Sequence, residues 1–101
     1  MATAYIREYA DLAVTFGKHA QCGAEPAIAE QTVTTSGTSA QSSAFNADTR
    51  LIAISTPAAQ AVCATFGADP TSTTSKFRLP ANSVFFFGVK PGHKVALIDV
   101  T

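Results

Sequence analysis

The residue types that could bind a metal are few in this chain and lie far apart. There are two histidines, His19 and His93, and two cysteines. His19 and Cys22 form an H-x-x-C pair, and imidazole and thiolate are both zinc ligands, but a closed zinc site needs four ligands and no further candidates cluster near this pair. His93 follows a Pro-Gly pair and is expected to be a solvated turn residue. The sequence therefore predicts no metal site and no cofactor.

The serine, threonine and acidic side chains show no catalytic pattern. A nucleophilic site needs Ser or Cys beside a base that a carboxylate orients, and the chain has no G-x-S-x-G or similar elbow. Asp48, Asp69 and Asp99 are isolated from one another in the sequence, so paired acid–base chemistry is not indicated. The stretch GADPTSTTS, residues 67–75, lacks the second glycine and the lysine of a phosphate-binding loop. We therefore expect a protein that is not an enzyme.

The two cysteines, Cys22 and Cys63, are too few for a framework of disulfides, and a reducing compartment would keep them as thiols. Cys63 lies in the apolar run AVCATF and is expected to be a small buried side chain. Cys22 lies in a segment expected to be a loop, which would leave it accessible. A disulfide between the two has no support in the sequence.

The size and charge of the chain indicate a single small domain that tends to associate with other subunits. The 101 residues fit one β domain, residues 1–101, with one hydrophobic core. Charged residues are 14% of the chain, and seven basic and seven acidic side chains cancel. The basic residues are scattered singly, so no phosphate-binding patch and no nucleic-acid partner are expected. A net charge near zero removes the repulsion that keeps proteins apart, which favours self-association.

No segment predicts membrane insertion. Residues 51–68 carry no charge and are about as long as a membrane span, but they include Pro57, Gln60 and Gly67. Residues 1–14 carry charges where a secretory signal would have its apolar run. We therefore expect no membrane partner and a protein that stays in the cytoplasm where it is made.

The elements that position these residues are predicted to be strands. Short apolar and β-branched runs alternate with breakers, and helical periodicity is nearly absent. The candidate strands are residues 3–9, 11–16, 27–36, 50–56, 60–66, 76–79, 83–89 and 93–100. They predict an all-β fold, a compact β-sandwich or jelly-roll-like barrel of about seven to eight short strands.

Three segments carry more specific predictions. Residues 18–26 contain a glycine and a proline and no strand pattern, so we expect a loop or extended arm, and part of residues 1–30 to act as that arm. The stretch KPG, residues 90–92, lies between two apolar runs and predicts a β-hairpin. Residues 57–66 begin with proline and are rich in alanine, so a helix is the alternative to a strand there.

Phe85, Phe86 and Phe87 stand side by side in a chain without tryptophan. Successive side chains of a strand point to opposite faces, so at least one ring points away from the core. We expect Phe85, Phe87 and Val89 to face the core because this set is bulkier, and Val84 and Phe86 to face the other way. Burying a phenylalanine is worth about 1.5 to 3 kcal/mol, so Phe86 should be covered, either by the protein's own second layer or by a partner.

Three stretches of the chain carry a resemblance to a known family. They are SAQSSAFN at residues 39–46, F-G-x-x-P-T-x-T-T-S at residues 66–75, and F-F-G-V-x-P-G-x-K-V-A at residues 86–96. In these stretches and their order, the chain resembles a family of small proteins encoded among the structural genes of tailed bacteriophages. The likeness runs over most of the chain, residues 5–98, and its marks are structural rather than catalytic.

The resemblance implies a virion component that is assembled in the cytoplasm of the host bacterium. The role it implies is that of a capsid decoration or cement protein, which binds the outside of the major capsid protein shell and stabilises it. Its partners would be the major capsid protein, copies of itself in a homo-oligomer such as a trimer, or both.

Two other roles stay open at this point. One is a component of the tail or of the head–tail connector, and the other is a carbohydrate-binding adhesion module on the virion. Sugar-binding surfaces usually present Trp or Tyr, and this chain has only Tyr5 and Tyr9. The residues expected to contact a partner are Tyr5, Tyr9, His19, Cys22, Val84 and Phe86.

Overall fold

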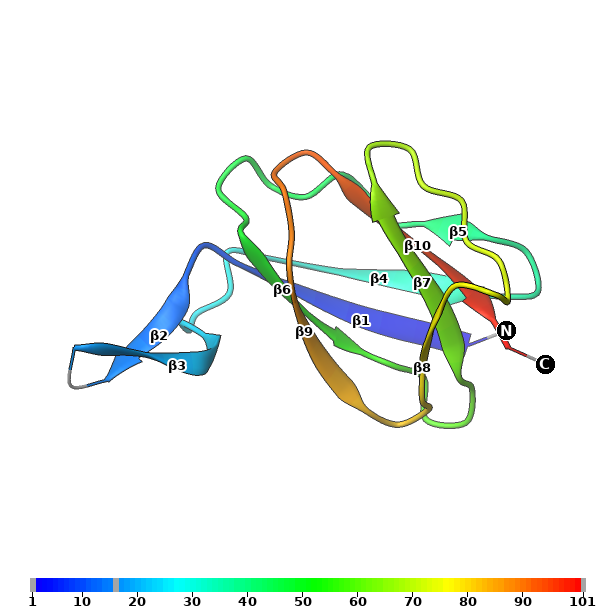
Figure 1. The fold of residues 1–101 in the computed structure, drawn as a ribbon, viewed down its shortest axis with the longest axis horizontal. Coiled ribbons are helices and arrows are strands. Elements are labelled where there is room, and N and C mark those ends of the chain that lie inside the picture. Colours follow the sequence, from blue (N-terminus) through cyan, green and yellow to red (C-terminus); the bar gives the residue numbers. More distant parts are fainter. Residues whose placement is uncertain (1, 16, 101) are drawn as a thin grey trace.

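The chain folds into two stacked antiparallel sheets and a hairpin that projects from one end (Figure 1). The structure is a computed structural model that describes residues 2–15 and 17–100, with only the backbone described for residues 15 and 19–22. The described residues form strands, turns and loops, and none of them belongs to a helix that could cross a membrane. The projecting hairpin accounts for the long dimension of the molecule, which measures 44 × 25 × 20 Å.

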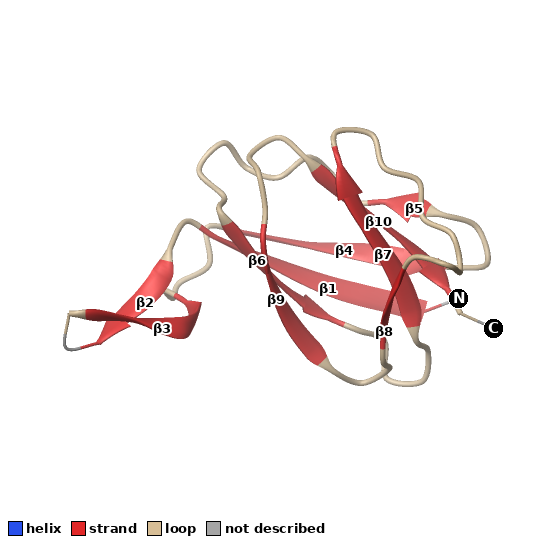
Figure 2. Ribbon diagram, in the orientation of Figure 1, coloured by secondary structure: helices blue, strands red, loops and turns tan. Residues whose placement is uncertain are grey.

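Each sheet of the sandwich has four strands (Figure 2). The first sheet consists, in spatial order, of β4 (Ala29–Thr35), β1 (Ala2–Tyr9), β6 (Leu51–Ser55) and β9 (Val84–Gly88). The second consists of β5 (Ala40–Gln41), β10 (Lys94–Asp99), β7 (Val62–Gly67) and β8 (Phe77–Leu79). The hairpin is formed by β2 (Leu12–Thr15) and β3 (Lys18–Gly23).

The strand pairs of the sandwich are nested. The innermost pair is β7 with β8, followed outward by β6 with β9 and β5 with β10. The outermost pair joins β4 to β1. The N-terminal strand β1 therefore occupies the position beside β4 that a strand following β10 would otherwise fill. The start of β1 and the end of β10 lie at the same end of the sandwich (Figure 1). This nested antiparallel order is the connectivity of a jelly roll whose last strand is supplied by the N-terminus.

The core lies between the two sheets and follows from alternation along each strand. Ile6 of β1 pairs with Ile54 of β6, and both are fully buried. From the second sheet, Val95 and Leu97 of β10 reach the same layer. The remaining buried members of the cluster are Ala4, Val33, Phe45, Ile52, Val62, Ala64 and Leu79. The predicted all-β sandwich is confirmed. The sandwich has eight strands, of which β5 was not predicted, and the strand predicted at residues 11–16 belongs to the hairpin instead.

The prediction of a loop or extended arm at residues 18–26 was wrong about a loop over residues 18–23, while residues 24–26 do lie outside the strands. Residues 18–23 form β3, which pairs with β2, and the chain reverses between them at Gly17, whose φ is 76°. The glycine and proline that suggested a loop end this strand rather than interrupt it. The arm expected within residues 1–30 is therefore a hairpin, whose strands satisfy each other's backbone groups away from the sandwich.

The prediction of a hairpin around residues 90–92 was also wrong. The chain does turn there, with the amide of His93 donating to the carbonyl of Lys90 at 3.2 Å. However, β9 pairs with β6 in the first sheet, and β10 pairs with β5 and β7 in the second. A Pro-Gly turn reverses the chain but does not determine which strands form hydrogen bonds with each other. The helical alternative at residues 57–66 is likewise wrong, because β7 occupies much of this segment.

Candidate partner-binding surface

The outer face of the first sheet carries large side chains on two strands and small ones between them. Pairing places Tyr5 of β1, Ser55 of β6 and Val84 of β9 in one row. The next row contains Arg7, Ala53 and Phe86. We call these six residues the aromatic face.

The aromatic face forms a trough because its middle strand is lined by small residues. Ala53 and Ser55 make the floor, while Tyr5 with Arg7 and Val84 with Phe86 stand on either side. The resulting hollow has a volume of about 340 Å³. Tyr5, Val84 and Phe86 remain 57%, 60% and 45% exposed, respectively. The trough therefore offers contact area to another molecule that the subunit does not use for its own core.

The three consecutive phenylalanines divide as the sequence predicts. Phe85 and Phe87 are partly buried and pack against the core, together with Val89. The Phe87 ring lies 5.0 Å from that of Phe66 and 6.3 Å, edge-on, from that of Phe77, measured between ring centroids. Phe86 points to the opposite, outer face and is not covered by the protein's own second layer.

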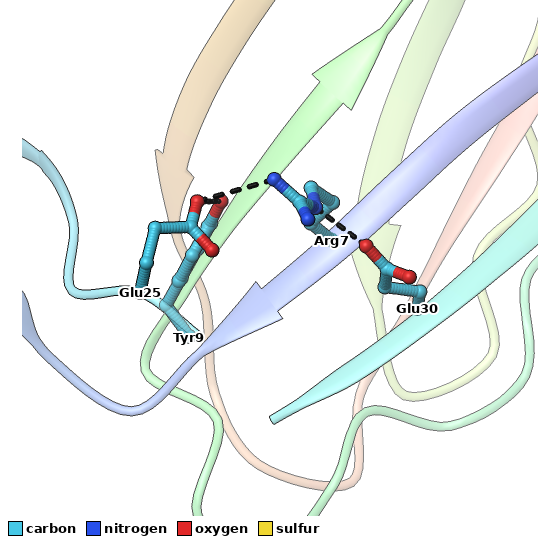
Figure 3. Close-up of polar contacts among 4 residues, drawn as sticks. All are labelled: Arg7, Tyr9, Glu25 and Glu30. Carbon is cyan, nitrogen blue, oxygen red and sulfur yellow. Dashed lines mark hydrogen bonds and ion pairs between the residues drawn. The ribbon is translucent and has the colours of Figure 1, made fainter. Parts of the chain in front are cut away.

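Arg7 holds a charged network at one side of the trough (Figure 3). Its Nε donates to Glu30 on the neighbouring strand β4, and one Nη donates to Glu25 at 3.1 Å. The hydrogen bond to Glu30 and the charges of both carboxylates raise the pKa of Arg7 above its ordinary value. All three side chains are about half exposed, so the network orients Arg7 beside the trough while leaving the guanidinium accessible.

Tyr9 joins the sandwich to the hairpin. Tyr9 is only 3% exposed, and Gly23, the last residue of β3, lies directly against its ring, so that a Cβ at Gly23 would fall 2.3 Å from the ring. The Tyr9 hydroxyl donates to Glu25 at 2.7 Å (Figure 3). Burial, followed by the hydrogen bond to Glu25, raises the pKa of Tyr9 above its ordinary value. These contacts fix the base of the hairpin at one end of the trough.

The structure brings together three of the six residues predicted to contact a partner. Tyr5, Val84 and Phe86 lie on the aromatic face. Tyr9 borders the trough, but its covered ring supports the hairpin instead of offering contact area. His19 and Cys22 lie in β3, and their side chains are outside the described part of the structure.

Sequence reasoning missed Arg7 and its two acidic partners. A signal for Arg7 was present, because it alternates with Tyr5 and Tyr9 and must share their face of the strand. No local signal identifies Glu25 or Glu30 as its partners. Glu30 comes close because β4 pairs with β1, and Glu25 lies in the link between the hairpin and β4.

A buried acid lies on the inner side of the same strand. Glu8 is 3% exposed and accepts hydrogen bonds from the Asn46 amide at 2.7 Å, the Thr49 hydroxyl at 2.8 Å and the Gln31 side chain at 3.2 Å. These donors belong to β4 and to the loop that leads into β6. Glu8 is therefore a structural acid that holds this loop against β1.

The other residues considered for chemistry lie apart. Cys63 is a buried free thiol within β7, as the sequence predicts for its apolar surroundings. Among the side chains that the structure describes, which do not include those of His19 and Cys22, no three His, Cys, Asp or Glu residues gather into a group that could hold a metal ion.

Comparison with protein-family models, curated proteins and solved structures found no match to this chain. The resemblance to phage structural proteins therefore stays a prediction from the sequence motifs.

Proposed function

We propose that this protein is a non-enzymatic structural component of a tailed-bacteriophage virion, a decoration or cement protein that binds the outside of the major capsid protein shell and stabilises it. The observation that carries the proposal is the aromatic face, where Tyr5, Val84 and Phe86 are exposed beside Arg7 although the sandwich already has a complete core. The sequence motifs supply the virion context.

The chemistry of the aromatic face suits protein contacts. Tyrosine and arginine are enriched among the residues that dominate binding energy, and Tyr5 and Arg7 stand next to each other along one side of the trough. A partner side chain that enters the trough would cover Phe86 and Val84 and recover the apolar burial that the free subunit forgoes. The partner would be the major capsid protein, a second copy of the chain, or both.

The hairpin at the end of the trough is suited to contact a neighbouring subunit. It projects beyond the sandwich (Figure 1), and Tyr9, Gly23 and Glu25 fix its base. A fixed projecting arm can reach a neighbouring subunit without first being ordered, which lowers the entropic cost of binding. A cement protein stabilises its shell through many such modest contacts.

The closest alternative is a component of the tail or head–tail connector, which would use the same surface. Copy number separates the two roles, because closed rings on the tail axis contain few subunits whereas a decorated shell contains many. Quantifying the protein against the major capsid protein in purified particles is the measurement. The carbohydrate-binding alternative is disfavoured by the burial of Tyr9, which leaves Tyr5 as the only exposed tyrosine among the described residues.

Two neighbouring phenylalanines give a matched test of the proposal. Phe86→Ser should keep the fold and weaken binding to shells that lack the protein, because Phe86 faces outward. Phe87→Ser should instead lower the free energy of unfolding, because that ring packs between Phe66 and the core. Co-sedimentation with shells reports binding, and thermal unfolding reports the fold. Full binding by a folded Phe86→Ser variant would contradict the proposed role of the aromatic face.

A further inference from the structure

A second hollow lies where the loop before β6 meets the turn between β9 and β10, and it has a different chemical character. Figure 1 shows these two segments on the same side of the sandwich. The hollow is open and has a volume of about 460 Å³, and none of the described residues that line it also lines the trough. Arg50, Lys90 and His93 line it together with Phe45 and Phe66.

The walls of this hollow are held by backbone hydrogen bonds. The Phe45 amide donates to the carbonyl of His93 at 2.8 Å, and the amide of Gly92 donates back to Phe45 at 3.1 Å. The amide of Val89 donates to the carbonyl of Arg50 at 3.0 Å. The backbone segments that carry the basic side chains are therefore tied to one another by the fold.

Arg50 and Lys90 have no acidic partner in the part of the chain that the structure describes. There, only Arg7 forms ion pairs. One Nη of Arg50 donates to the carbonyls of Ala47 and Thr49 at 3.2 Å, which orients the guanidinium while its other donors stay available. Asp48, the acid nearest to Arg50 in the sequence, does not line the hollow.

We propose that this basic pocket binds a carboxylate that is flanked by apolar groups, as in an acidic–hydrophobic segment of a partner polypeptide. The planar fork of Arg50 matches a carboxylate, Lys90 adds a second charge, and neither forms an ion pair with a described acidic residue. Phe66, which is partly exposed, provides an apolar surface for the flanking groups, and the buried Phe45 also lines the hollow. This site is independent of the aromatic face and would add a second contact with any partner.

Two small peptides test the chemistry of the pocket. The probe is acetyl-Leu-Asp-Leu-amide, and its matched control replaces the aspartate by asparagine. Amide chemical shifts of Gly67 and Gly88, which line the hollow, report occupancy in the intact protein. We expect saturable shifts with the aspartate peptide and at least about tenfold weaker binding of the asparagine peptide, since a charge-assisted hydrogen bond is worth roughly one decade or more in affinity.

Matched variants identify the residues. The double variant Arg50→Gln, Lys90→Gln should bind the aspartate peptide about tenfold or more weakly than the wild type. The double variant Lys76→Gln, Arg78→Gln removes the same charge elsewhere and should leave the affinity for the peptide unchanged. Thermal unfolding checks that each variant is folded, and Lys90→Gln alone serves if the double change unfolds the protein. Equal binding of both peptides, equal loss in both double variants, or absence of shifts would overturn the proposal. So would inorganic phosphate that shifts the same amides at lower concentration than the peptide.

Discussion

The contact between Gly23 and Tyr9 leads to a sharp prediction about stability. A Cβ added at Gly23 would lie 2.3 to 2.5 Å from three carbons of the Tyr9 ring, whereas carbon atoms pack favourably at about 3.5 to 4 Å. The ring or the hairpin must therefore move by more than about 1 Å. Because Tyr9 is almost fully buried, neither can move without opening packed surface.

We expect Gly23→Ala to lower the free energy of unfolding by about 2 kcal/mol, the middle of the range for overpacking a buried site. For a domain of this size, that corresponds to a fall of about 8 to 16 °C in the unfolding midpoint. The φ angle of Gly23 is not in the left-handed region, so the contact and not the backbone sets the cost. Thermal and urea unfolding, followed by circular dichroism, measure the change.

Gly37→Ala is the matched control, because nothing lies within 4 Å of the added Cβ and its φ is also ordinary. That variant should differ from the wild type by less than about 0.5 kcal/mol. In a Tyr9→Ala background, Gly23→Ala should cost much less, since its obstacle is gone. If Gly23→Ala were as stable as Gly37→Ala and the hairpin amides remained equally protected from hydrogen exchange, the argument that Tyr9 anchors the hairpin would be refuted.

Three further predictions concern single positions. The raised pKa of Tyr9 means that the folded state favours the neutral phenol. The contribution of Tyr9 to stability is therefore complete below the unfolded pKa of about 10 and is lost as pH rises through the folded pKa. Urea unfolding between pH 9 and 11 should show the stability of the wild type falling relative to that of Tyr9→Phe. Glu8→Ala should cost about 2 to 4 kcal/mol in urea unfolding, because the buried Thr49 hydroxyl and an amide lose their acceptor; a loss below 1 kcal/mol would contradict the structural role of this acid. Asn82 has a φ of 54°, so Asn82→Ala should lower the unfolding midpoint whereas Asn82→Gly should not, and equal effects of both changes would count against backbone strain as the cause.

Much of the fold was predictable because strands leave a local signal. The alternation of Ala4, Ile6 and Glu8 against Tyr5 and Arg7 is visible in the sequence, and the structure buries the first set. The inward and outward rings of the phenylalanine run follow from the same two-residue period. The segment that forms β3 was missed because its few apolar residues carry no such period, and its pairing with β2 decides its structure.

The sequence alone determined that the protein is all-β, built of short strands, with one phenylalanine ring turned away from the core, because alternation, breakers and composition are properties of neighbouring residues. Only the tertiary structure decided that β9 and β10 belong to different sheets, that Tyr9 lies under Gly23, and that Arg50 and Lys90 share one hollow. These facts depend on which strands pair across long stretches of chain. That choice is made by the burial of whole faces against each other, which no local pattern of residues specifies.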